Sequence, residues 1–188
     1  PPTTSEVLPS SGILATTLEA EDGLSLEIGT RGDFINNRIS YDVNVFQYNL
    51  KNAIVIRRDA LGRDYFVNAG STRQAGLEGQ GSYWFDRGKE LKPSRVWLSY
   101  TLYYFEYRNY QRGTTDYSGK RLPSVPQNNL CLGTDLFFKR GPYAHLIYTH
   151  TDRIPLNDAN TDWAPAADLL SARLGFRKKI SHNKTIDL

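Results

Sequence analysis

The sequence predicts an all-β fold of about eight antiparallel strands in up-and-down order, of the kind that forms the wall of a transmembrane barrel. Three observations predict it. Polar and apolar residues alternate in one segment after another, which is the period-two pattern of strands with two unlike faces. Several segments exceed the ~5–6 residues of an ordinary strand. Short and long connectors mostly alternate, as where turns lie at one rim of a barrel and loops at the other.

Composition narrows the possible classes. The 188 residues are enough for one domain, and no run approaches the ~20 apolar residues that a transmembrane helix needs. The net charge is +3, but the basic residues are interspersed, so we expect no nucleic-acid partner. The one cysteine, Cys131, excludes an internal disulfide framework and any site with several cysteine ligands.

The first half of the chain begins with a loop over residues 1–20, rich in Pro, Ser and Thr. Residues 23–32 alternate as a strand and end in a turn cluster. We expect one long strand over residues 38–57, a turn at 60–63, and then residues 65–85, which pass through an Asn-Ala-Gly step into a further long strand.

The second half repeats this pattern. We expect strands at residues 95–110, 129–139, 143–151 and 167–177, with a last strand beginning near residue 184. The connectors between them are turns at 86–94, 139–142 and 178–183 and long polar loops at 111–126 and 152–165. The only rival helical pattern covers residues 164–174.

The apolar side of the strands ends in aromatic residues. Tyr83, Phe85, Phe138 and Phe176 each close a strand beside a short connector. Such rows mark the boundary between membrane and water in a barrel wall.

The opposite side of the strands carries charges of both signs. Burying unpaired charges in a dry core would cost several kcal/mol each, so we expect this side to line a wet lumen that holds a plug. The residues expected to face it are Glu27, Asp42, Glu78, Arg95, Asp135 and Arg173.

Five weak motifs in a fixed order carry a family resemblance. The stretch 56–85 contains NAG at 68–70, TR at 72–73 and GLE at 76–78, and further motifs are LEIG at 26–29, VFQYNLKN at 45–52, LPSVP at 122–126 and LNDANT at 156–161. Together they resemble the barrel of TonB-dependent outer-membrane receptors over about residues 22–188.

The resemblance implies a ~22-stranded barrel filled by a plug, of which this chain would be a late part, near strands 14 to 21. Residues 1–188 would then be a partial barrel domain that lacks the plug, the TonB box and the final strand. It implies active import of ferric siderophores or similar scarce nutrients across the bacterial outer membrane. Partners would be the TonB complex, through the absent plug and TonB box, and the lipid bilayer with its lipopolysaccharide.

Basic and aromatic residues near the long loops are candidate contacts for an anionic ferric siderophore. Arginine presents planar donors to carboxylates, and tyrosine adds stacking and a hydroxyl group. The candidates are Arg57, Arg58, Arg63, Tyr107, Arg108, Tyr110 and Arg112.

No enzyme, cofactor or metal site is expected. The sequence has no nucleophile motif and no carboxylate pair that can be placed together. Asp158, Asn160 and Asp162 have the spacing that begins a calcium loop, but Trp163 replaces the required glycine, so we expect a solvated loop. His145 and His150 should face opposite sides of one strand, which excludes a shared metal.

Two alternatives stay open on the sequence. A self-contained small barrel with a structural or adhesive role requires the first and last strands to pair. A soluble β-sandwich binding module requires a dry core, and its members would be Leu98, Tyr100, Leu102, Leu132 and Leu136.

Overall fold

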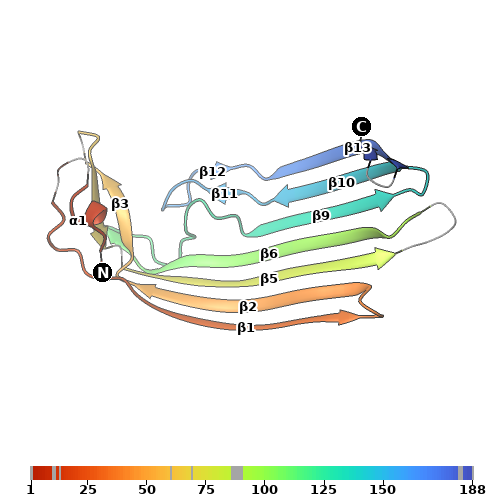
Figure 1. The fold of residues 1–188 in the computed structure, drawn as a ribbon. Coiled ribbons are helices and arrows are strands. Elements are labelled where there is room, and N and C mark those ends of the chain that lie inside the picture. Colours follow the sequence, from red (N-terminus) through yellow and green to blue (C-terminus); the bar gives the residue numbers. More distant parts are fainter. Residues whose placement is uncertain are drawn as a thin grey trace.

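The computed structural model describes residues 2–9, 12, 14–59, 61–68, 70–85, 91–181 and 184–187, which form one open antiparallel sheet with small hairpins at one end (Figure 1). A four-residue helix, α1 (Thr4–Val7), lies in the N-terminal segment that we expected to be loop. In this part of the chain, no helix has the length and apolar character needed to cross a membrane.

Eight strands form the sheet, and each pairs with its neighbours in chain order. They are β1 (Asp22–Phe34), β2 (Ile39–Lys51), β5 (Ser71–Phe85), β6 (Ser94–Asn109), β9 (Asn128–Phe137), β10 (Pro142–Thr151), β13 (Ala167–Ser181) and β14 (Lys184–Asp187). This confirms the all-β class and the up-and-down order. The rival helix at 164–174 is wrong, because its alternating Leu and Ala residues belong to β13. The turn expected from residue 178 is also wrong as far as residue 181, where β13 ends.

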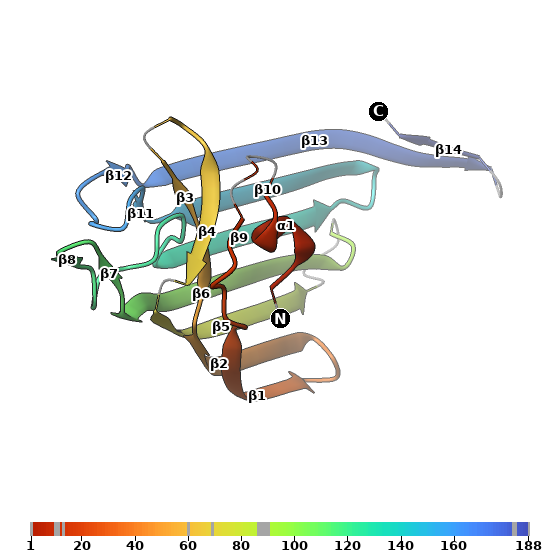
Figure 2. The same cartoon turned by 90° about the vertical axis from the view of Figure 1, so that its left-hand side faces the viewer.

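Three small hairpins stand at one end of the sheet (Figures 1 and 2). They pair β3 (Ile54–Arg58) with β4 (Asp64–Asn68), β7 (Gln111–Arg112) with β8 (Thr115–Asp116), and β11 (Ile154–Pro155) with β12 (Trp163–Ala164).

The strand expected at 38–57 is therefore two strands. It breaks at Asn52, which has a φ of 54°. The stretch 65–85 also breaks, at Gly70 with a φ of 74°, where a Cβ atom would lie 1.6 Å from the carbonyl oxygen of Asn109. Only glycine fits there, because the backbone of the neighbouring segment occupies the place of a side chain.

This hairpin makes the alternation of connectors regular. Residues 61–63 of the expected turn lie between β3 and β4, inside a long connection over residues 52–70, and residue 60 lies outside the described residues. Long connections thus lie at one rim, at 52–70, 110–127 and 152–166. The opposite rim has short turns, such as the one between β1 and β2, in which Ile35, Asn36 and Asn37 all have positive φ.

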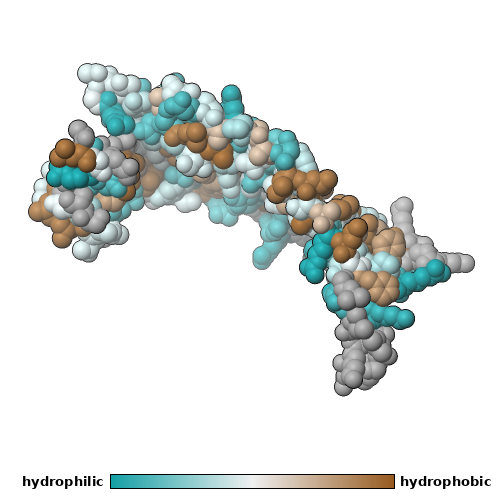
Figure 3. Space-filling view, turned by 90° about the horizontal axis from the view of Figure 1, so that it is seen from above, coloured by the Kyte–Doolittle hydropathy of each residue, from teal (hydrophilic) through white to brown (hydrophobic). Residues whose placement is uncertain are grey.

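The register gives the sheet two unlike faces, a polar face and an apolar face. One cross-strand row holds Asn44, Glu78 and Thr101, and the next row, on the other face, holds Val45, Leu77 and Leu102. The sheet is curved, as the view along its edge shows (Figure 3).

The apolar face excludes a sandwich core in the described residues. Leu98 and Leu132 lie on that face and are 45% and 43% exposed, with no second sheet against them. The buried hydrophobic cluster that the structure does contain, Tyr107 with Tyr110, lies at the long-loop end. The self-contained barrel also fails in these residues, because β1 and β14 are the two edges of the sheet and do not pair.

Candidate functional site

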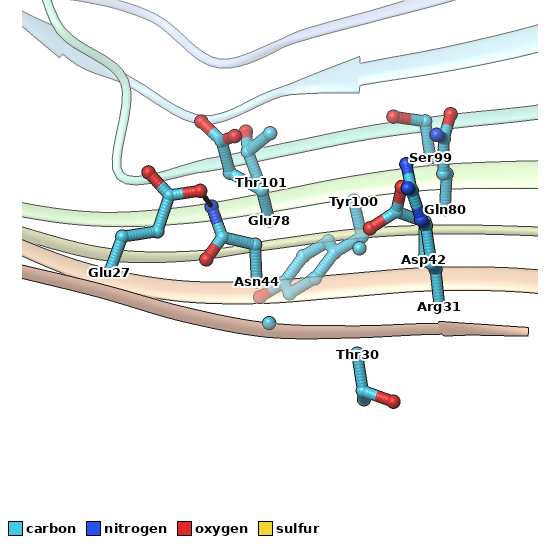
Figure 4. Close-up of a pocket in the computed structure, with 12 residues that line it drawn as sticks. Glu27, Thr30, Arg31, Asp42, Asn44, Glu78, Gln80, Ser99, Tyr100 and Thr101 are labelled. Atoms are coloured by element: carbon cyan, nitrogen blue, oxygen red, sulfur yellow. Dashed lines mark hydrogen bonds between the residues drawn. The ribbon is translucent and has the colours of Figure 1, made fainter.

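A hollow of about 640 Å³ lies on the polar face across β1, β2, β5 and β6 (Figure 4). Alternation places its polar side chains, because every second residue of each strand points to this side. The side chains that line it include Glu27, Asp42, Asn44, Glu78, Gln80 and Thr101. Thr30, one residue along β1 from this row, points to the opposite side of the sheet.

Two of the carboxylates of this hollow, Glu27 and Glu78, accept hydrogen bonds. Asn44 donates from Nδ2 to Glu27 at 2.7 Å, and the Tyr103 hydroxyl donates to Glu78 at 2.6 Å. Asp42 faces Arg31 across β1 and β2 in register. The hollow is thus a hydrogen-bonded, water-accessible wall that favours polar contacts.

A second polar group lies nearer the short-turn rim. Arg95 donates to one carboxylate oxygen of Asp135 from Nε at 3.0 Å and from Nη2 at 2.7 Å. The other oxygen lies 2.7 Å from Nδ1 of His145. The Arg95 guanidinium also lies over the rings of Trp84 and Trp97, at 5.3 and 6.0 Å from their centroids.

All six charges that the sequence assigned to one side do lie on the polar face. The register brings Arg95 next to Asp135 and sets Arg173 opposite His145, whereas Glu27, Asp42 and Glu78 belong to the separate hollow. That this face lines a lumen stays a prediction.

His145 and His150 point to opposite faces, as their spacing predicted, and His150 pairs with Asp168 at 2.8 Å. In the described residues there is no cluster of metal-ligating side chains.

Two of the long loops are joined into one unit. The hydroxyl groups of Tyr107 and Tyr110 donate to the two carboxylate oxygens of Asp158, at 2.8 and 3.0 Å. Asn160 bonds both the backbone N–H and the carbonyl of Arg121, at 2.8 and 2.9 Å. Asp158 and Asn160 are thus half-buried and hydrogen-bonded to the neighbouring loop, whereas Asp162 of the same segment is exposed.

The candidate ligand contacts differ in accessibility. Tyr107 and Tyr110 are 5% and 2% exposed, and their hydroxyl groups are already engaged. Arg112 is exposed, and Arg108 is half exposed and pairs with Glu106 at 3.2 Å.

The β3–β4 hairpin carries the other three candidates. Arg63 pairs with Asp59 at 2.8 Å. The pKa of Asp59 is lowered, first by the backbone N–H of Arg63 and then by its guanidinium. The side chains of Arg57 and Arg58 lie outside the described part of the structure.

Sequence reasoning missed one cluster at the same rim. Trp163 has the guanidinium of Arg153 at 4.4 Å and that of Arg121 at 5.9 Å from its ring centroid, and its Nε1 donates to the Asn160 carbonyl at 2.7 Å. These residues come from two loops, so no local sequence pattern marks them.

Comparison with known proteins places the chain. The model of a family described as "TonB dependent receptor-like, beta-barrel" matches residues 1–188. No curated protein matches the sequence.

Solved structures of similar fold include three receptors or transporters. The siderophore receptor PiuA from Acinetobacter baumannii has a TM-score of 0.68 at 19% identity over 94% of this chain and 25% of its own. The ferric preacinetobactin receptor BauA from the same organism has a TM-score of 0.64 at 18% identity, over 84% of this chain and 23% of its own. The copper transporter OprC has a TM-score of 0.71 at 13% identity, over 99% of this chain and 28% of its own. This chain thus spans about a quarter of each of these proteins.

Proposed function

The chain belongs to the TonB-dependent receptor β-barrel family, and on that premise we propose that it forms part of the wall of an outer-membrane receptor that imports a scarce nutrient. The family is one of transporters and not of enzymes. The observation that carries the proposal is the two-faced sheet with a long-loop rim at one end and short turns at the other.

In the proposed protein the apolar face contacts lipid and the polar face lines the lumen. The long loops face the cell exterior and receive the ligand. The hollow with Glu27, Asp42 and Glu78, and the Arg95–Asp135–His145 group, then contact a plug that a longer chain supplies. Energy from the TonB complex moves that plug. The barrel wall performs no covalent chemistry.

Ferric siderophores are the first ligand class to test, because PiuA is described as a siderophore receptor and BauA as a ferric preacinetobactin receptor. The exposed Arg108 and Arg112 supply cations for an anionic complex. Contact through Arg57, Arg58, Arg63, Tyr107 and Tyr110 stays a prediction. We assign Tyr107 and Tyr110 first to joining the loops, because both are buried.

The test is uptake by the full-length receptor in a Gram-negative host that lacks its own siderophore receptors. Labelled ferric siderophores, free iron and copper are offered to cells with and without TonB. The expected result is TonB-dependent uptake of a ferric siderophore. Uptake of copper alone would contradict ferric siderophores as the ligand class and indicate copper instead. Uptake that persists without TonB would contradict the proposed coupling.

The loop unit gives a sharper version of this test. Asp158→Ala removes the acceptor of both tyrosine hydroxyl groups and should weaken ligand binding at least about tenfold, because the two loops lose their shared anchor. Asp116→Ala is the matched control, since that carboxylate bonds only within its own turn, to Ser118. Equal binding by the two variants would contradict the role of the joined loops.

A further inference from the structure

The N-terminal segment and the β3–β4 hairpin lie together at the long-loop rim. Figure 2 shows α1 beside β4, and the two elements are in contact. The segment then passes the base of the hairpin and enters the sheet at Asp22, where β1 begins. We use the word cap for the described residues of these two parts, 2–21 and 52–70.

One amide side chain joins the two parts of the cap. Asn68, the first residue of the Asn-Ala-Gly step, accepts a hydrogen bond at Oδ1 from the backbone N–H of Glu19 at 2.8 Å. Its Nδ2 donates to the carbonyl oxygen of Glu19 at 3.0 Å and to that of Asn52 at 2.7 Å. The amide therefore bonds both backbone groups of Glu19 and also reaches the other side of the hairpin base.

Two carboxylates of the N-terminal segment complete this contact. Oε2 of Glu19 accepts a hydrogen bond from Nδ2 of Asn52 at 2.8 Å. Oε1 of Glu21 accepts one from the backbone N–H of Ile54, also at 2.8 Å. The residues that lead into β1 are thus bonded to both ends of the hairpin.

The contact requires asparagine at position 68. An asparagine side chain offers an acceptor oxygen and two N–H donors, and the structure uses both kinds of group. Aspartate would set a second acceptor against two carbonyl oxygens, and glutamine would be one methylene too long. A strand position alone would accept many residue types, so the residue type here is set by the N-terminal segment.

The cap joins the sheet through two unusual backbone positions. Asn52 and Gly70, at the two ends of the hairpin, have φ values of 54° and 74°. Just beyond Asn52, Val55 packs against the buried cluster of Tyr107 and Tyr110. The position of the cap is therefore passed on to the loops that this cluster joins.

We infer that Asn68 is a positioning residue, which holds the N-terminal segment and the hairpin as one body at the rim where the ligand arrives. The inference rests on the proposed function, which assigns ligand receipt to this rim. Arg63 lies near the tip of the hairpin, and Arg108 lies between the two tyrosines that Val55 contacts. Loosening the cap thus changes the entrance and leaves the wall intact.

The first measurement is hydrogen exchange of the full-length receptor, followed by mass spectrometry. Asn68→Asp should raise the exchange rate of residues 16–21 by about tenfold, because the amide no longer donates to Glu19 and Asn52. The exchange of β5 and β6 should stay as in wild type. Asn129→Asp is the matched control, since Asn129 is exposed on β9, outside the cap.

The second measurement is binding of the labelled compound, ferric siderophore, iron or copper, that wild-type cells take up. Asn68→Asp should bind it about tenfold more weakly, and Asn129→Asp should bind it like wild type. A covalent tie should replace the amide. In a Cys131→Ser background, Glu19→Cys with Asn68→Cys should bind weakly before treatment with a short bis-maleimide and like wild type after it.

Two outcomes would overturn the inference. Equal exchange of residues 16–21 in Asn68→Asp and wild type would show that the amide does not hold the segment. Weak binding that the covalent tie fails to restore would show that the contact does not position the entrance. Heat-modifiable gel migration reports membrane assembly separately. A wild type that does not assemble, or that takes up none of the three compounds, contradicts the proposed function, whereas the exchange result bears on Asn68 alone.

Discussion

In strands β5, β9 and β13, the glycines on the two faces of the sheet have opposite surroundings. On the polar face, an aromatic ring of a neighbouring strand lies over each of three glycines. A Cβ added to Gly133 would meet the Trp97 ring at 2.3 Å, one on Gly175 would meet Tyr143 at 2.3 Å, and one on Gly76 would meet Phe46 and Tyr103 at 2.8 Å. On the apolar face, a Cβ on Gly79 would meet nothing within 3.8 Å.

The difference shows how one strand pattern serves two surroundings. A ring that lies flat over a glycine packs against the backbone of the next strand and still leaves room in front of the polar face. On the apolar face, Gly79 and Gly81 of β5 leave their space open, whereas Gly32 of β1 lies under the Tyr41 ring. In the proposed membrane wall, lipid fills the open space. Crowding does not require glycine at positions 79 and 81. The nearest atoms to an added Cβ lie at ordinary contact distance, 3.8 Å at Gly79 and 3.6 Å at Gly81.

The largest expected effect comes from a charge on the apolar face. Leu77→Arg places a guanidinium in the middle of the apolar row and should cost about 2–4 kcal/mol at the bilayer midplane, enough to block membrane assembly. Heat-modifiable gel migration of the full receptor measures assembly.

The matched variant on the polar face is Gln80→Ala. Gln80 is exposed on that face, and this substitution should leave assembly unchanged. Equal assembly of Leu77→Arg and Gln80→Ala would show that the faces are assigned the wrong way round.

The second effect comes from the covered glycines. Gly133→Val should lower the free energy of unfolding by about 1–3 kcal/mol, because the new side chain overlaps the Trp97 indole. Urea titration of the folded receptor measures it, with a fall in tryptophan fluorescence anisotropy if the indole is displaced. The double variant Gly133→Val with Trp97→Ala should recover part of the loss. If the double variant recovers no stability, the loss in Gly133→Val does not come from overlap with the Trp97 indole.

The third effect tests the charges of the polar face. Asp135→Asn removes the carboxylate shared by Arg95 and His145. It should lower the free energy of unfolding, measured by urea titration, by about 1 kcal/mol, because the Arg95 side chain is 38% exposed and solvent screens the pair. Glu27→Gln, which keeps a partner in Asn44, should cost less. If the two variants lower the free energy of unfolding by the same amount, the Arg95–Asp135–His145 group stabilises the fold no more than the single Asn44–Glu27 hydrogen bond does.

Sequence reasoning predicted the faces and not the loop contacts, for a physical reason. Period-two alternation is local, so the side of Glu27, Glu78 or Leu77 follows from adjacent residues. The break at Asn52 was missed, because strand-like residues flank it, whereas the Asn-Ala-Gly step at 68–70 marked the one at Gly70. The pairing of Tyr107 with Asp158 joins residues 51 positions apart, and nothing near either residue signals the other.

The smallest expected effect is on the open glycine of the apolar face. Gly79→Ala should raise the free energy of unfolding by about 0.4–1 kcal/mol, because the backbone there is extended, the methyl group meets only Val43 at ordinary contact distance, and the unfolded chain loses freedom. Urea titration in parallel with Gly76→Ala measures the contrast, since Gly76→Ala should destabilise against Phe46 and Tyr103. A loss of stability in Gly79→Ala equal to that of Gly76→Ala would mean that the open space on the apolar face is not open in the membrane, and the comparison between the two faces would fall with it.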